Sequence, residues 1–206
     1  MVYLLHVIIK SGNKLEPGNY RPISIISIVS KILEKAVHSQ LYSYLEQHTL
    51  LTDCQSGFRP LHSTSTCILD ITEYLLENMS SGNVTGGIFL DLRKAFDVIP
   101  HEILLQKLSL FGIKGTELQW FKDYITERRQ CVTVAGKLSD FLPVKSGVPQ
   151  GSTLGPLIFS MFINDIPNVK LLPSSKLVLY ADDTAVFCKG RTWQEVETQL
   201  QIQLML

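Results

Sequence analysis

The sequence predicts an α+β fold with an antiparallel sheet, and two observations support this class. Along the 206 residues, segments with helical periodicity are interspersed with short apolar runs that are too short for helices. This mixed order of helices and short strands is typical of an α+β architecture. In addition, two β-rich runs near the end of the chain are joined by a short polar turn, which indicates an antiparallel hairpin.

The predicted helices have apolar residues at the spacing of one helix face. They cover residues 28–48, 66–79, 104–111, 116–128, 152–166 and 192–206. Pro100 precedes the third helix at a position where a first helical turn tolerates proline, and Gly112 closes that helix. The helix over residues 152–166 is predicted despite Gly155-Pro156 near its start.

The predicted strands are short apolar or β-branched runs bounded by turn residues. They cover residues 87–91, 130–135, 141–145, 176–180 and 184–188. The second and third are joined around Gly136-Lys137, and the last two flank residues 181–183 in a hairpin. With no repeat or low-complexity linker, the sequence indicates one compact domain.

The composition excludes several classes of protein. A hydrophobic fraction of 45% is too high for a disordered chain. The 19 basic residues balance 19 acidic ones, which argues against a protein that holds nucleic acid mainly through bulk positive charge. The four cysteines have neither zinc-ligand spacing nor a disulfide framework. The apolar start, residues 1–9, is too short to span a bilayer and lacks the features of a signal peptide. We expect a soluble, intracellular protein, with nucleus and cytoplasm unresolved.

Three aspartates form the candidate reactive centre. Asp91 ends the strand over residues 87–91, and Asp182 and Asp183 lie at the tip of the later hairpin. If both elements pair in one sheet, these carboxylates converge at one edge. Carboxylates without His or Cys suit Mg²⁺, and two such ions can stabilise the attacking and leaving oxygens of a phosphoryl transfer. Taken singly, an aspartate at a turn is more often a solvated turn residue.

Five ordered motifs extend this interpretation. They are YRPIS from Tyr20, QSGFR from Gln55, FLDLRKAFD from Phe89, SGVPQGSTLGPLIF from Ser146 and LYADD from Leu179. Together they resemble the reverse transcriptase domain of non-LTR (LINE-type) retrotransposons, over nearly the whole chain. The resemblance implies the fingers and palm of a right-hand polymerase with an antiparallel palm sheet and no thumb. Residues 1–85 would be fingers-like and residues 86–206 mostly palm, incomplete at the C-terminal end.

The resemblance also implies a role for each site residue. Asp91 and Asp182 would coordinate two Mg²⁺ ions, with Asp183 assisting and the Leu92 carbonyl as a further ligand. Phe96 would be the aromatic gate that excludes a sugar 2′-hydroxyl. The remaining nucleotide- or template-contacting residues would be Gln150, Gly151, Arg59, Arg21 and Lys94. The implied partners are an RNA template, a DNA primer and deoxynucleoside triphosphates, with no membrane and an unknown oligomeric state.

Alternatives remain open at this point. The first is a catalytically inactive, truncated relic of such a domain, at most a weak nucleic-acid-binding module, because processive synthesis needs a thumb. An RNA-dependent RNA polymerase is disfavoured by Phe96, and a structural metal protein would not need the Pro149-Gln150-Gly151 loop. The zero net charge then indicates truncation, and predicts weak, salt-sensitive binding to template and primer.

Overall fold

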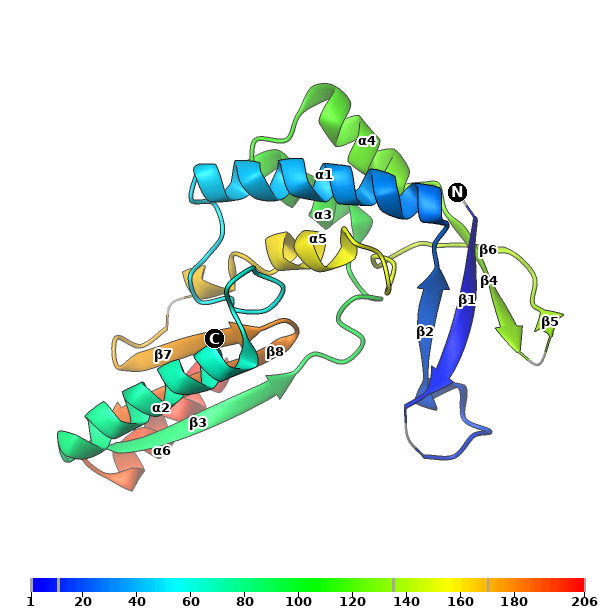
Figure 1. Ribbon diagram of the computed structural model, residues 1–206. Coiled ribbons are helices and arrows are strands. Elements are labelled where there is room, and N and C mark those ends of the chain that lie inside the picture. The colour runs from blue at the N-terminus through cyan, green and yellow to red at the C-terminus, as the bar shows by residue number, and fades with distance from the viewer. Residues whose placement is uncertain (1, 11, 135, 170, 206) are drawn as a thin grey trace. The chain divides into compact units, whose positions relative to one another are not determined.

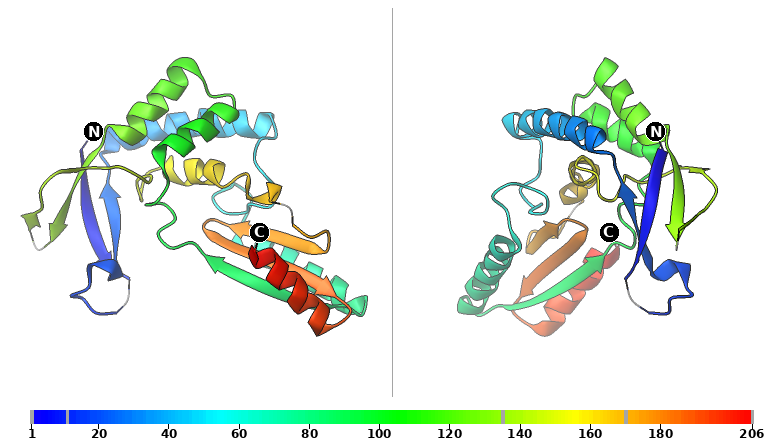
Figure 2. Two further views of the ribbon diagram at one scale, coloured as in Figure 1. Left: turned by 180° about the vertical axis from the view of Figure 1, so that it is seen from behind. Right: turned by 45° about the vertical axis from the view of Figure 1, so that its right-hand side comes forward.

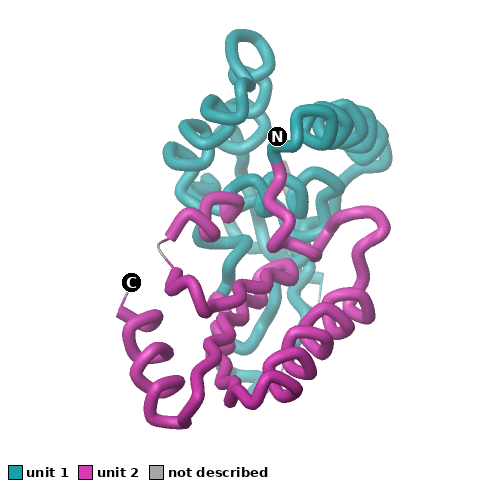
Figure 3. Tube along the Cα trace, turned by 90° about the vertical axis from the view of Figure 1, so that its left-hand side faces the viewer, with its two compact units in different colours: residues 1–50, 94–162 teal, residues 51–93, 163–206 magenta. Residues whose placement is uncertain are grey.

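The computed structural model describes residues 2–10, 12–134, 136–169 and 171–205, and it divides into two compact units. Unit 1 comprises residues 1–50 and 94–162, and unit 2 comprises residues 51–93 and 163–206 (Figure 3). Each unit is therefore assembled from two stretches that are separated in the chain. The division into fingers and palm near residue 85 stays a prediction.

Unit 1 contains a mixed five-stranded sheet (Figure 1). Its strands are β1 (Val2–Ile9), β2 (Tyr20–Ile25), β4 (Arg129–Val134), β5 (Lys137–Leu138) and β6 (Leu142–Pro143). Their order is β2-β1-β4-β5, and β6 also pairs with β4. The β1–β4 pairing is parallel and the others are antiparallel, so the expectation of purely antiparallel pairing fails for this sheet.

Strands β1 and β2 are absent from the elements predicted above. Pro17, Gly18 and Pro22 interrupt the sequence there, but β2 accommodates Pro22 because it is an edge strand. Proline at an edge can leave its missing N–H on the unpaired side of the ladder. Residues Pro17–Asn19 form a short 3₁₀ turn before β2. The predicted strand over residues 130–135 agrees with β4 up to Val134, and Ala135 lies outside the described residues.

The helices of unit 1 are α1 (Ile28–Gln47), α3 (His101–Leu110), α4 (Gly115–Thr126) and α5 (Gly155–Phe162). The first three agree closely with the predicted segments. The fourth is shorter than predicted, because the Ser152 hydroxyl accepts the Gly155 N–H at 2.7 Å and starts the helix there. After α5 the chain turns, and Pro167 belongs to a separate 3₁₀ turn, Ile166–Asn168, in unit 2.

A buried polar centre ties two helices of unit 1 to the loop before α5. Glu34 of α1 is only 2% exposed. One carboxylate oxygen accepts the Tyr124 hydroxyl of α4 at 2.9 Å, and the other accepts the Thr153 N–H at 2.7 Å. A buried carboxylate is tolerated when such donors satisfy it. The largest buried apolar side chains of unit 1 come mainly from its helices: Leu41, Leu45, Leu104, Leu108, Phe121, Ile125, Ile158 and Phe159.

Unit 2 is a three-stranded antiparallel sheet with a helix on each face (Figures 1 and 2). Its elements are β3 (Val84–Asp91), β7 (Ser175–Tyr180), β8 (Asp183–Gly190), α2 (Thr64–Ser80) and α6 (Trp193–Met205), and the strand order is β3-β8-β7. Ile71 and Tyr74 of α2 pack on one face, with Phe187 of β8. On the other face, a Cβ at Gly86 would come within 2.7 Å of Val196 of α6, so only glycine allows that helix to pack so closely.

The elements of unit 2 confirm the predicted strand that ends at Asp91, the helices predicted over residues 66–79 and 192–206, and the hairpin between residues 176 and 188. All four cysteines are free, and three of them are buried. No helix in the described ranges has the length and apolarity needed to cross a bilayer.

Replacing Tyr124 tests the buried polar centre. Tyr124→Phe leaves one Glu34 oxygen without its buried donor, so we expect a loss of about 1–3 kcal/mol in the free energy of unfolding at neutral pH. Burial raises the pKa of the Tyr124 phenol, so the folded state favours the neutral form. That stabilisation is complete below the unfolded pKa of about 10 and is lost as the pH rises further. Denaturant unfolding from pH 8 to 11.5 should therefore show a flatter alkaline decline for Tyr124→Phe than for the wild type. Parallel curves would contradict the assignment.

Candidate active site

The pairing of β3 with β8 places two of the three candidate carboxylates side by side in unit 2. Asp91, the last residue of β3, is the register partner of Asp183, the first residue of β8. Opposed residues of an antiparallel pair have Cβ atoms about 4.5–5.5 Å apart and side chains on the same face. Asp182 precedes Asp183 in the turn between β7 and β8. The expected convergence at one end of a sheet is confirmed for Asp91 and Asp183.

A cavity of about 420 Å³ adjoins the two paired carboxylates on the α2 side of the sheet. Its walls are mostly apolar: Cys67, Ile71, Phe89, Leu90, Asp91, Val178, Tyr180, Asp183, Thr184 and Ala185. Burial, and secondly the charge of Asp70, raise the pKa of the Cys67 thiol, so this wall is neutral at physiological pH. Among the described residues that line the cavity, the charged groups are therefore the two aspartates of the sheet.

The QSGFR motif lies along the hairpin that carries Asp182 and Asp183. Leu179 of β7 donates its N–H to Cys54 at 2.8 Å and accepts the Ser56 N–H at 2.9 Å. Arg59 donates from Nη1 to the carbonyl of Thr52 at 2.9 Å, so its guanidinium closes the loop that contains the motif. This contact gives Arg59 a structural partner within unit 2.

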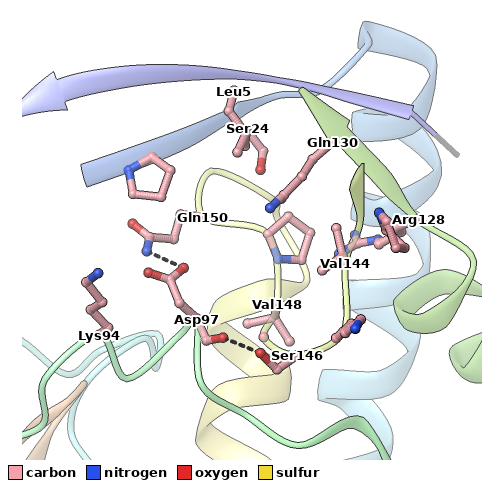
Figure 4. A pocket seen from close by; sticks show the side chains of 15 residues that line it. Leu5, Ser24, Lys94, Asp97, Arg128, Gln130, Val144, Ser146, Val148 and Gln150 are labelled. Carbon is pink, nitrogen blue, oxygen red and sulfur yellow. Dashed lines mark hydrogen bonds between the residues drawn. The ribbon is translucent and has the colours of Figure 1, made fainter. Parts of the chain in front are cut away.

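The SGVPQG segment of unit 1 is hydrogen-bonded to the last two residues of the FLDLRKAFD motif, Phe96 and Asp97. Val148 donates its N–H to the carbonyl of Phe96 at 2.8 Å, and the Ser146 hydroxyl donates to the carbonyl of Asp97 at 2.9 Å. The Gln150 side chain donates from Nε2 to Oδ1 of Asp97 at 2.8 Å, as the dashed line in Figure 4 shows. These bonds fix the segment against residues 96–97.

A pocket of about 430 Å³ lies over this junction in unit 1 (Figure 4). Lys94, Asp97 and Gln150 are among its lining residues, together with Pro22 and Ser24 of β2. The pocket therefore presents an amide, a carboxylate and an ammonium group to any ligand that enters it. Arg21 is exposed on β2 and is not among the residues that line the pocket.

Phe96, the predicted gate, and Gly151 each have a specific neighbour within unit 1. The Phe96 ring stacks on Phe159 of α5 with centroids 4.5 Å apart, which fixes the ring plane. Gly151 has φ +98°, and a Cβ there would lie 3.2 Å from the Ser24 carbonyl. The close approach that the structure shows for Gly151 is thus to the backbone of β2.

The predicted site residues divide between the two units. Unit 2 carries Asp91, Asp182, Asp183, Leu92 and Arg59, and unit 1 carries Phe96, Lys94, Gln150, Gly151 and Arg21. Within the described ranges, no group of three or more His, Cys, Asp or Glu residues is positioned to hold a metal ion. The aligned pair of carboxylates still offers the hard oxygen ligands that Mg²⁺ prefers.

Sequence reasoning missed three residues that form hydrogen bonds to loops within their own unit: Glu34 and Asp97 in unit 1, and Gln55 in unit 2. Gln55 and Asp97 belong to the motifs QSGFR and FLDLRKAFD but had received no role. Their position inside two of the five ordered motifs was the available signal. Glu34 gave a weaker signal, as an acidic residue among the apolar positions of α1.

The fold and these motifs define a reverse transcriptase domain. The family described as reverse transcriptase (RNA-dependent DNA polymerase) matches residues 8–204, and the chain belongs to it. The probable RNA-directed DNA polymerase from transposon BS of Drosophila melanogaster is 33% identical over 191 residues, which cover 90% of this chain and 21% of that protein. The RNA-directed DNA polymerase from mobile element jockey of the same species is 32% identical over 188 residues, which cover 89% of this chain and 20% of that protein.

These relatives confirm the resemblance to non-LTR retrotransposons, and the chain spans about a fifth of their length. Among solved structures, apo telomerase from Candida tropicalis superposes with a TM-score of 0.69 at 12% sequence identity, covering 100% of this chain and 41% of that chain. At this identity the likeness shows the fold alone.

Gly147 provides a test of the contact between the SGVPQG segment and residues 96–97 in unit 1. Its φ is +85°, and a Cβ would lie 2.7 Å from the carbonyl oxygens of Phe96 and Asp97. Gly147→Ala should therefore lower the free energy of unfolding by about 3 kcal/mol, through backbone strain and a backbone clash. Gly136→Ala is the matched control, because Gly136 has φ +77° with no atom within 4 Å. It should cost about 1 kcal/mol. Equal losses in urea denaturation would contradict the packing described.

Proposed function

We propose that this chain is the nucleotidyl-transfer portion of an RNA-directed DNA polymerase, which adds deoxynucleotides to a primer 3′-hydroxyl on an RNA template. The observation that carries the proposal is the register of β3 against β8, which aligns Asp91 with Asp183 and leaves Asp182 one residue away in the turn. Membership of the reverse transcriptase family supports the choice of reaction.

The carboxylates would hold the metal ions of the reaction. Asp91 and Asp182 would coordinate two Mg²⁺ ions, with Asp183 and the Leu92 carbonyl as further oxygen donors. When bound, such ions neutralise charge on the triphosphate and stabilise the attacking and leaving oxygens. The exposed position of Asp91 and Asp183 at the end of the sheet suits groups that must reach a phosphate. Their alignment on one strand pair keeps both carboxylates on one face of the sheet.

The unit 1 residues would bind the incoming nucleotide. Gln150 would accept or donate hydrogen bonds at the sugar, and its amide is already oriented by Asp97. Phe96 would exclude a 2′-hydroxyl with a ring whose plane is set by Phe159. Lys94, at the pocket, and Arg21, exposed on β2, would meet phosphates of the nucleotide or template. Arg59 would do so only in addition to its bond to Thr52.

Primer extension with an Asp182 variant tests the activity directly. With an RNA template, a DNA primer, deoxynucleotides and Mg²⁺, the wild-type chain should extend the primer, and Asp182→Asn should lower the rate by about 100-fold or more because a metal ligand is lost. Asp123→Asn, at an exposed residue of α4, removes a charge elsewhere and should leave the rate unchanged. No extension by the wild type would favour the inactive-relic alternative instead.

Sugar selectivity tests the role of Phe96. Phe96→Val should raise the ratio of ribonucleotide to deoxynucleotide incorporation about 10-fold or more, because the smaller side chain leaves space for a 2′-hydroxyl. The ratio is the appropriate measurement, since loss of the stacking on Phe159 lowers stability as well. Phe96→Tyr keeps the ring and should keep the selectivity. A ratio unchanged in Phe96→Val would refute the gate.

A further inference from the structure

We propose that Gln55 is a positioning residue for the hairpin that carries the catalytic aspartates, acting through the backbone of Ala181. The inference rests on the proposed function of Asp182 and Asp183. All of the residues involved belong to unit 2. The Gln55 side chain forms hydrogen bonds with Ala181 and Gly57 rather than with the aspartates. Its effect is therefore on the conformation of the turn.

The Gln55 side chain forms hydrogen bonds with both backbone polar groups of Ala181. Its Nε2 donates to the carbonyl of Ala181 at 3.1 Å, and its Oε1 accepts the Ala181 N–H at 3.0 Å. The same oxygen accepts the Gly57 N–H at 2.7 Å. With 3% of its surface exposed, Gln55 makes these bonds without competition from water. The primary amide thus gives the N–H and the carbonyl of Ala181 the hydrogen bonds that a neighbouring strand would otherwise supply.

The turn needs such support because its backbone is strained. Tyr180 pairs with Asp183, so Ala181 and Asp182 form the two-residue loop of the hairpin. Ala181 has φ 54°, in the left-handed region where hairpin loops usually have glycine, asparagine or aspartate. Alanine neither prefers this conformation nor has a side chain that could stabilise it. Contacts from outside the hairpin must therefore fix the turn, and the residue they fix immediately precedes Asp182.

Gly57 allows the motif to lie against this turn. A Cβ on Gly57 would be 2.1 Å from the nitrogen of Ala181 and 2.7 Å from its Cα. Any side chain at residue 57 would push the turn away, because real Cβ atoms do not approach backbone atoms so closely. The backbone bonds of Cys54 and Ser56 to Leu179 attach the same segment one step earlier in β7. The first three residues of QSGFR thus pack directly against the hairpin.

A positioning role of Gln55 predicts a kinetic effect that a purely structural role does not. The bonds of Cys54 and Ser56 do not involve the Gln55 side chain, so the segment stays attached to β7 when that side chain changes. Removing the amide should then disturb Ala181 and the aspartates after it, while nucleotide binding in unit 1 is unaffected. The expected signature is a fall in kcat at nearly constant KM for the nucleotide.

The test compares Gln55→Met and Gln55→Glu with the wild-type chain. Gln55→Met removes all three bonds, whereas Gln55→Glu keeps the shape and the two accepted N–H bonds but opposes the Ala181 carbonyl with a second oxygen. Each variant should lower kcat for primer extension about 10- to 100-fold, since small misplacements of reacting groups have effects of this size. Amide hydrogen exchange by NMR should show a faster-exchanging Ala181 N–H in Gln55→Met. Gln40→Glu, an exposed change on α1, is the matched control.

A rescue variant separates strain from general destabilisation. Glycine adopts φ 54° freely, so Ala181→Gly added to Gln55→Met should recover about 3-fold or more of the lost kcat. If Gln55→Met retains wild-type kcat, or keeps the Ala181 amide as protected as in the wild type, the proposal is wrong. If Gln55→Met does not fold, Gln55→Glu decides in the same way. Absence of extension by the wild-type chain would instead refute the proposed function, while the exchange of Ala181 still reports on the hydrogen bond.

Discussion

The antiparallel pairing of β3 with β8 is the constraint on which the candidate catalytic centre depends. It aligns Asp91 with Asp183 although the two residues are far apart in the chain. Because side chains alternate across a strand, a shift of one residue in this register would move one carboxylate to the opposite face. Gly86 and Gly87 help to fix the register. A Cβ at Gly86 would lie 2.7 Å from Val196 of α6, and a Cβ at Gly87 would lie 2.9 Å from Phe187 of β8, so a shift that placed a larger residue at either position would cause a clash. Helix packing and catalytic geometry are therefore specified by the same strand.

Loops in both units are held by the same kind of interaction, a hydrogen bond from a polar side chain of another segment. In each, a buried or half-buried polar side chain binds backbone or side-chain groups of a functional loop: Gln55 binds Ala181, Asp97 binds Gln150 and Glu34 binds the Thr153 N–H. Loops lack the regular hydrogen bonds of helices and sheets, so such side chains provide the missing partners. Preorganised loops need less reordering when a substrate binds, which favours catalysis by positioning.

The net charge of zero has a different meaning once the family is known. The chain spans about a fifth of the length of its curated relatives, so its net charge is not comparable with the net charge of those proteins. Within it, the basic candidates have unlike surroundings: Lys94 lines the unit 1 pocket, Arg21 is exposed on β2, and Arg59 bonds to its own loop. Local placement of charge, rather than its total, therefore decides which of these residues can meet a phosphate.

The sequence by itself determined the helices, the C-terminal hairpin, the candidate carboxylates and the family motifs, because periodicity and turn chemistry are local properties. It did not predict β1 and β2, since the pairing of β2 with β1 overrides the local signal of Pro22. It also could not assign partners to Gln55 and Asp97, whose hydrogen bonds join residues 126 and 53 positions apart. Only the tertiary structure decides such contacts, because a side chain's donors and acceptors specify what it can bind but not which distant segment the fold brings to it.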